Sequence, residues 1–219
     1  MNIAENLENI KAELPKDVLL VAVSKTKPVS DLMEAYNYGQ RIFGENKIQE
    51  MASKWQEMPK DIEWHMIGDV QRNKVKYMAS FVSLIHAVDS FRLLNEINKQ
   101  AQKHNRVIDC LLQIKIADEE SKFGMSEVEA TTLLDSEEIK TLQNVKVTGL
   151  MGMATFTDNV SQLEEEFGYL KGVYEKIKSQ YPDLQILSMG MSGDYTLAIE
   201  HGSTMVRVGS AIFGARNYV

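Results

Sequence analysis

Lys25 stands in a sequence context that could make its amine reactive. It follows the apolar run VLLVAV, and the surrounding segment reads VSKTKP, with a second lysine at position 27 and a strand-ending proline at position 28. A lysine that is desolvated beside another cation has a lowered pKa and can act as a nucleophile toward a carbonyl group. The alternative is an ordinary solvated lysine at a strand end, because lysine is rarely buried.

Two later segments have the composition of phosphate-binding loops. MGMSGD follows one apolar run and contains Ser192, and GSAIFG follows the last run and contains Gly209 and Ser210. Glycine permits close approach of the backbone, serine adds a hydroxyl donor, and the start of a helix offers a favourable dipole to an anion. Either segment alone could be an ordinary turn, since turns favour glycine and serine.

A reactive lysine opposite two such loops could hold a phosphorylated carbonyl compound at both ends. Pyridoxal phosphate and sugar phosphates both meet this description. Arg207 lies two residues before Gly209 in MVRVG, so a strand would place both residues on the same face. A structural arginine at the edge of the core is the alternative interpretation of Arg207.

The elements that must position these residues are predicted by hydrophobic periodicity. Short apolar runs predict eight strands, at residues 18–24, 41–43, 62–67, 82–88, 107–116, 145–151, 185–189 and 205–208. Segments with helical spacing lie between them, clearest at Leu163, Phe167, Leu170, Tyr174 and Ile177. Buried parallel strands alternating with helices predict a (β/α)8 TIM barrel, with its site at the carboxyl ends of the strands. A doubly wound open sheet is the alternative, because 41–43 is a weak strand.

Composition narrows the class of protein. A chain of 219 residues, 44% of them hydrophobic, predicts a single domain over 1–219 with a sizeable core. The formal net charge of -7 argues against a nucleic-acid partner. The N-terminal segment does not resemble a signal peptide, and no apolar run approaches the roughly 20 residues of a membrane helix. With Cys110 as its only cysteine, we expect a soluble, cytoplasmic protein without a membrane partner.

Three smaller features carry structural expectations. Ser30 is predicted to cap the helix that follows Lys25. The acidic triplet at 164–166 is expected on the exposed side of its helix. His65 and His86 lie within apolar runs, so they are interpreted as hydrogen-bonded interior residues, and no set of residues suggests a metal site.

The chain resembles the pyridoxal phosphate homeostasis protein family over nearly its whole length. The resemblance lies in VSKTKP, FGEN, WHMIG, SKFG, GLMGM, MGMS and the closing run GSTMVRVGSAIFGARNY. VSKTKP, FGEN and the closing run are the most specific, because they occur in this order at fitting positions. The family is similar in fold to the N-terminal barrel of alanine racemase, which implies a barrel of that kind here.

The resemblance also implies a cofactor and its contacts. Lys25 would form a Schiff base with pyridoxal 5'-phosphate, and the phosphate would be held by Ser192, Gly209 and Ser210. Arg207 would face the pyridine nitrogen, where a cation keeps that nitrogen unprotonated and weakens the ring as an electron sink. Asn46 would lie near the ring or its hydroxyl group, although an asparagine there could equally cap the next helix.

Two further positions bear on the resemblance. Gly193 departs from the family pattern, in which an acidic residue follows Ser192, and Asp194 comes directly after it. Lys122 in SKFG is a candidate for assisting transfer of the cofactor.

The resemblance implies binding without strong catalysis. Alanine racemase needs a second domain whose tyrosine supplies a base on the opposite face of the cofactor, and this chain ends at Val219 directly after the predicted barrel. We therefore expect a monomer without catalytic residues that stores, buffers or delivers pyridoxal phosphate, with cofactor-dependent apo-enzymes as recipients. One alternative is a racemase that uses a loop tyrosine or histidine as second base. The other is a Schiff-base aldolase acting on sugar phosphates.

Overall fold

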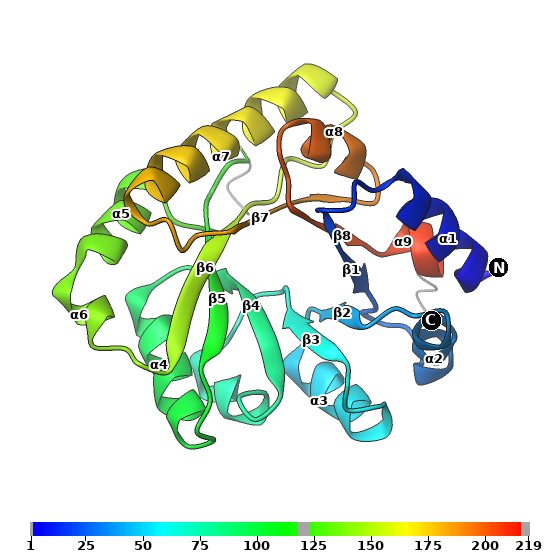
Figure 1. The fold of residues 1–219 in the computed structure, drawn as a ribbon, viewed down its shortest axis with the longest axis horizontal. Helices are drawn as coiled ribbons and strands as arrows, with labels where there is room; N and C mark the ends of the chain where they lie inside the picture. Colours follow the sequence, from blue (N-terminus) through cyan, green and yellow to red (C-terminus); the bar gives the residue numbers. More distant parts are fainter. Residues whose placement is uncertain (1, 118–122, 216–219) are drawn as a thin grey trace.

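The chain folds as a closed barrel of parallel strands surrounded by helices (Figure 1). The computed structural model describes residues 2–117 and 123–215. The strands of these residues are β1 (Leu19–Val23), β2 (Ile42–Glu45), β3 (Glu63–Met66), β4 (Val82–Val88), β5 (Ile108–Gln113), β6 (Val145–Met151), β7 (Ile186–Met191) and β8 (Met205–Val208). They pair in chain order, and β8 pairs with β1. The predicted (β/α)8 barrel is confirmed, and the open-sheet alternative is wrong.

The helices form a ring around the barrel (Figure 1). They are α1 (Ile3–Glu13), α2 (Val29–Asn37), α3 (Ile48–Glu57), α4 (Phe91–Gln102), α5 (Glu127–Asp135), α6 (Glu137–Lys140), α7 (Val160–Gln180), α8 (Tyr195–Glu200) and α9 (Ser210–Phe213). A 3-10 helix, η1 (Arg72–Tyr77), connects β3 to β4. Within the described part of the chain, no helix has the length and apolarity that a bilayer-spanning segment needs.

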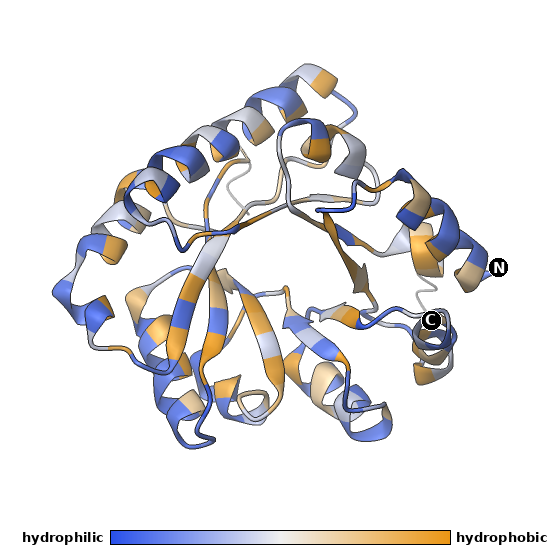
Figure 2. Cartoon of the chain, in the orientation of Figure 1, coloured by the Kyte–Doolittle hydropathy of each residue, from blue (hydrophilic) through white to orange (hydrophobic). Residues whose placement is uncertain are grey.

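Two apolar layers explain why the strands are continuously hydrophobic. The larger layer packs between strands and helices and includes the fully buried Phe43, Trp64 and Phe167. The smaller layer consists mainly of strand residues and fills the barrel interior with Val21, Leu84, Ala87, Leu111, Met151 and Met205. Strands covered on both faces lack an alternating polar side. In Figure 2, β1 and β4 are accordingly mostly orange, whereas the helices carry both colours.

Two local predictions are wrong. The N-cap of α2 is Pro28 rather than Ser30, because the proline holds an extended backbone and the helix begins directly after it. Glu166 of the acidic triplet is buried at 7% exposure, whereas its two acidic neighbours are exposed. Its carboxylate accepts hydrogen bonds from the Thr155 N–H and the Thr155 hydroxyl, both at 2.6 Å. A charged residue on a helix is thus buried here because a loop supplies it with donors.

His65 and His86 lie in the barrel interior, as predicted. Both side chains are buried, and His65 Nδ1 lies 3.1 Å from His86 Nε2. Burial lowers the pKa of His65 to about 3. Burial lowers the pKa of His86 well below its ordinary value as well, with further contributions from His65 and Arg207. Both imidazoles are therefore neutral in the folded protein near pH 7.

Gly149→Ala tests how closely β6 approaches β7. A Cβ at Gly149 would lie 1.9 Å from the Ile186 carbonyl oxygen, so we expect the free energy of unfolding to fall by about 2 kcal/mol or more. Gly172→Ala in α7 is the matched control, because a Cβ there meets nothing within 4 Å. It should be neutral or stabilising by up to about 1 kcal/mol. Urea denaturation of both variants measures the difference, and equal stabilities would contradict the prediction.

The two histidines predict a loss of stability in mild acid. Each is neutral when folded but takes up a proton in the unfolded chain below its ordinary pKa of 6.5, so stability falls as the pH drops from there toward about 3. The decrease should reach about 1.4 kcal/mol per pH unit for each histidine. His86→Gln should flatten the decrease that urea denaturation measures between pH 7 and pH 5, whereas replacement of the exposed His104 by Gln should not. An unchanged slope in His86→Gln would disprove this explanation.

Candidate functional site

A cavity of ≈ 670 Å³ opens at the carboxyl ends of the strands. This volume lies within the range of about 300–1,000 Å³ that is typical of small-molecule sites. The residues assigned from the sequence all line it: Lys25, Asn46, Ser192, Arg207, Gly209 and Ser210. The barrel thus brings together residues from β8 itself and from the segments after β1, β2, β7 and β8.

Lys25 lies in a tight turn directly after β1. The Lys27 N–H donates to the Ser24 carbonyl at 3.1 Å and closes this turn. The Lys27 amine donates to the carbonyl oxygens of Phe213 (2.7 Å) and Ala215 (3.1 Å), which fastens the turn to the segment that ends α9. The half-buried Lys25 side chain lines the cavity from this turn.

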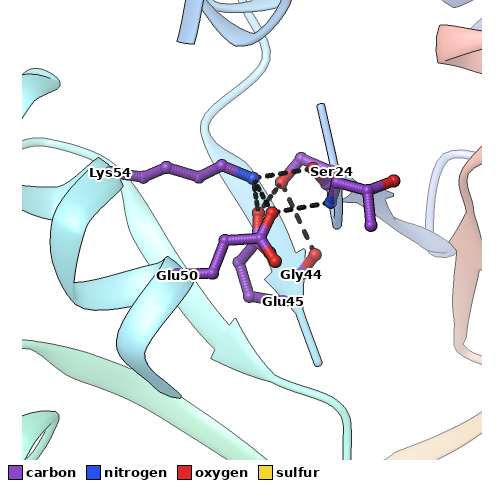
Figure 3. A network of polar contacts seen from close by, with 6 residues as sticks. Ser24, Gly44, Glu45, Glu50 and Lys54 are labelled. Carbon is purple, nitrogen blue, oxygen red and sulfur yellow. Dashed lines mark hydrogen bonds and ion pairs between the residues drawn. The ribbon is translucent and has the colours of Figure 1, made fainter. Parts of the chain in front are cut away.

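A buried ion cluster packs against the same turn (Figure 3). The amine of Lys54 in α3 donates to the Ser24 carbonyl (2.8 Å) and to the carboxylates of Glu45 (2.7 Å) and Glu50 (2.7 Å). No pattern in the sequence predicts this cluster. Glu45 belongs to FGEN, a segment in which only Asn46 was assigned a contact with the cofactor, and a lysine in a polar helix carries no sign of burial.

The segment after β8 directs two backbone donors toward one point in the loop after β7. The N–H groups of Gly209 (3.0 Å) and Ala211 (3.5 Å) both point at Ser192 Oγ. Two converging N–H groups are an arrangement that binds an anion oxygen. Gly209 is the N-cap of α9 and Ala211 lies in its first turn, so both donors belong to the start of this four-residue helix.

Arg207 is buried, with 4% of its surface exposed, and lines the inner part of the cavity. Its guanidinium donates from Nη1 to Ser188 Oγ (2.6 Å) and from Nη2 to the Gly152 carbonyl (2.9 Å), both uncharged acceptors. Burial lowers its pKa to about 10, opposed by the negative charge of Asp194. The side chain therefore remains a cation at neutral pH, anchored in the core and facing the cavity.

A network of hydrogen bonds runs from Arg207 into the barrel. Because a guanidinium only donates, Ser188 Oγ accepts from it, and the same oxygen is hydrogen-bonded to His86 Nδ1 at 3.2 Å. His86 Nε2 is in turn hydrogen-bonded to His65 Nδ1 at 3.1 Å. The network thus links the buried cation to the two neutral imidazoles.

Asn46 follows β2 and lines the cavity without capping the next helix. The N-cap position of α3 is Lys47, and it makes no side-chain cap hydrogen bond. The backbone of Gly68 in WHMIG packs against Asn46, since a Cβ on that glycine would lie 2.5 Å from the Asn46 carbonyl oxygen. Only glycine permits this approach, which links the FGEN and WHMIG segments.

The rim of the cavity contains residues that the sequence analysis did not assign. The loop after β6 contributes Thr155, whose backbone and hydroxyl are held by Glu166. Phe123 and Phe156 also line the cavity and are 69% and 95% exposed. Gly193 and Asp194 both line it, and Asp194 accepts a hydrogen bond from the Met191 N–H at 2.5 Å. The candidate transfer residue Lys122 lies outside the described residues.

The arrangement suits the capture of an anionic carbonyl compound. An amine from the β1 loop, an anion cradle from the β7 and β8 loops, and an interior cation share one cavity. Among residues 2–117 and 123–215, no group of three or more histidine, cysteine or acidic side chains could hold a metal ion.

Comparison with known proteins shows the family of the chain. A family model described as alanine racemase, N-terminal domain, matches residues 1–217. A pyridoxal phosphate homeostasis protein from Vibrio alginolyticus is 41% identical over 233 residues, which cover 99% of both chains.

Solved structures of similar proteins have the same fold over nearly the whole chain. Those of PipY from Synechococcus elongatus PCC7942, without and with PLP, superpose with TM-scores of 0.90 and 0.88 at 35% and 34% identity, covering 97% of this chain and 100% of theirs. Alanine racemase of Clostridium difficile 630 has a TM-score of 0.81 at 15% identity and covers 98% of this chain and 57% of its own, which shows the fold alone. The family model spans residues 1–217, and the Vibrio alginolyticus relative is 41% identical over 99% of both chains. This chain therefore belongs to the pyridoxal phosphate homeostasis protein family.

Proposed function

We propose that this protein binds pyridoxal 5'-phosphate at Lys25 through a Schiff base and stores, buffers or delivers it in vitamin B6 homeostasis. The observation that carries the proposal is the meeting of the Lys25 loop, the N–H donors after β8 and the buried Arg207 in one cavity. The names of the curated relatives and the PLP-bound structure of PipY support it.

The cavity residues fit the functional groups of this cofactor. The N–H groups of Gly209 and Ala211 already converge on a single oxygen, as one phosphate oxygen requires, and Ser192 and Ser210 add hydroxyl donors. When bound, pyridoxal phosphate supplies an aldehyde that condenses reversibly with an amine. Lys25 offers that amine from the turn after β1, the strand that pairs with β8.

Arg207 and Asn46 are assigned to the ring. A permanent cation at the ring nitrogen disfavours protonation of that nitrogen, which weakens the ring as an electron sink. The hydrogen bonds of Arg207 to Ser188 and Gly152 hold its guanidinium in place for this role. The half-buried amide of Asn46 is the polar neighbour that we assign to the ring hydroxyl.

This site favours binding over turnover. The curated relatives are named as homeostasis proteins rather than as enzymes. A racemase needs a second base, and no tyrosine or histidine is among the described residues that line the cavity. The likeness to alanine racemase is one of fold, and none of the named relatives is an aldolase, so neither enzymatic alternative gains support.

The proposal also covers the domain organisation, the cellular compartment, the oligomeric state and the recipients of the cofactor. We infer one domain over 1–219, since the family model spans 1–217. A reducing cytoplasm suits Cys110, whose thiol is buried and has a pKa raised by that burial. A monomer agrees with exposed hydrophobic side chains that are spread over separate elements, such as Leu19, Tyr77 and Val107. Recipient apo-enzymes would approach the rim that carries Phe123 and Phe156.

Lys25→Ala tests the attachment site. Wild-type protein mixed with pyridoxal phosphate should show the visible absorption band of a lysine–cofactor linkage, and borohydride should make the linkage permanent. The variant should lose both properties because its reacting amine is gone. Lys16→Ala, at an exposed lysine outside the cavity, should retain them. A band that persists in Lys25→Ala refutes the assignment, and no band in the wild type favours the aldolase alternative.

Ser192→Ala tests the phosphate cradle. Loss of one hydrogen bond to a charged phosphate should weaken binding of pyridoxal phosphate by roughly 10- to 100-fold, equivalent to about 1.5–3 kcal/mol. Binding of pyridoxal, which lacks the phosphate, should change little, and Ser161→Ala on the exposed side of α7 should affect neither ligand. Titration followed by absorbance measures the affinity of the wild type and of both variants for each ligand. Equal weakening for both ligands would place the phosphate elsewhere.

A further inference from the structure

The buried ion cluster of Lys54, Glu45 and Glu50 holds both peptide groups that flank Lys25. The Lys54 amine donates to the Ser24 carbonyl, which belongs to the peptide group before Lys25, at 2.8 Å. The Thr26 N–H, which belongs to the peptide group after it, donates to Glu50 Oε1 at 2.6 Å. The hydroxyl of Ser24 adds a third restraint by donating to Glu45 Oε1 at 2.6 Å.

The backbone held in this way is strained. Thr26 has a φ of 65°, in the left-handed region that is unfavourable for a β-branched residue. Its position as the third residue of the turn from Ser24 to Lys27 is one where glycine is the usual choice. Such a conformation persists only when surrounding contacts impose it. The hydrogen bond from Thr26 to Glu50 is one of those contacts.

Stability alone is a poor explanation for this cluster. The side chains of Lys54 and Glu45 are 7% and 0% exposed, and Glu45 Oε2 has no hydrogen-bond partner in the described structure. Burial raises the pKa of Glu45 even though Lys54 and Ser24 oppose that shift. Buried ion pairs of this kind add little stability compared with well-packed apolar side chains. Their geometric effect on the turn is the feature that apolar residues would not reproduce.

We propose that Lys54 and Glu50, supported by Glu45, are positioning residues for Lys25: they hold the strained turn that directs the Lys25 amine into the cavity. The three side chains come from the end of β2 and from α3, so the β1 loop is held by its neighbouring βα unit (Figure 3). The proposal rests on the proposed function, because it assigns this role toward the amine that binds pyridoxal phosphate.

Glu50→Ala and Glu50→Gln provide the matched test. Glutamine retains an acceptor for the Thr26 N–H, whereas alanine removes it and still leaves Lys54 paired with Glu45. In protein without cofactor, hydrogen exchange of the Thr26 amide should be roughly tenfold faster in Glu50→Ala and near wild type in Glu50→Gln. Exchange of β8 amides should be unchanged in both. Glu137→Ala, at an exposed glutamate paired with Lys140, is the control for a Glu-to-Ala change on a helix.

Cofactor binding provides the second readout. The affinity for pyridoxal phosphate and the rate at which the Lys25 linkage forms should both fall about tenfold in Glu50→Ala and recover in Glu50→Gln. The double variant Glu45→Gln/Lys54→Met removes the Lys54–Glu45 ion pair without leaving either charge buried alone. It should show the same loss of affinity and the same slower formation of the linkage.

The outcomes separate this inference from the proposed function. The positioning role is overturned if the wild type binds pyridoxal phosphate through Lys25 and Glu50→Ala binds it equally well, with equally slow amide exchange at Thr26. That result leaves the proposed function intact. Exchange that rises equally at Thr26 and in β8 also overturns it, because the cluster would then act on global stability. A wild type that forms no linkage overturns the function, while amide exchange at Thr26 still tests the restraint of the turn.

Discussion

Pairing of β1 with β8 closes the barrel, and the site depends on that closure. The two strands are joined along Leu19↔Met205 to Ala22↔Val208, although one lies near the start of the chain and the other near its end. The approach is close enough that a Cβ on Gly209 would lie 3.1 Å from the Val23 carbonyl oxygen. Without this pairing, the lysine-bearing turn and the anion cradle would not share a cavity.

Two buried cations serve the site in different ways. Arg207 faces the cavity and is held by the uncharged acceptors Ser188 and Gly152, so its charge remains available to a ligand. The Lys54 amine is hydrogen-bonded to two carboxylates and a carbonyl, so its charge holds the turn that carries Lys25 and does not face a ligand. Burial of either charge is unfavourable by itself, so neither is explained by stability alone.

The interior histidines connect the core with the site. Neutral His65 and His86 complete a hydrogen-bond network that starts at Arg207, so the contacts that hold this guanidinium extend into the barrel interior. This arrangement suits a binding protein. It holds a cation at the place assigned to the ring nitrogen, where a positive charge weakens the ring as an electron sink.

The sequence by itself determined the architecture and most of the contacts assigned to the cofactor. Strands covered on both faces are continuously apolar, so eight apolar runs predicted the eight strands. The errors lie only at strand ends; for example, the predicted strand 107–116 is β5 at Ile108–Gln113. The barrel rule then placed Lys25, Arg207 and Gly209 at one mouth, because strand ends of a parallel barrel face the same way.

Tertiary structure alone decided which charged side chains are buried. Lys54, Glu45 and Glu166 occur in segments whose composition is typical of solvated surfaces, and Glu166 was predicted to be exposed for that reason. Each is buried because partners far away in the sequence, Ser24 or Thr155, supply hydrogen bonds. Periodicity reports how apolar a face is, whereas the burial of a charge depends on a partner that only the folded chain brings near.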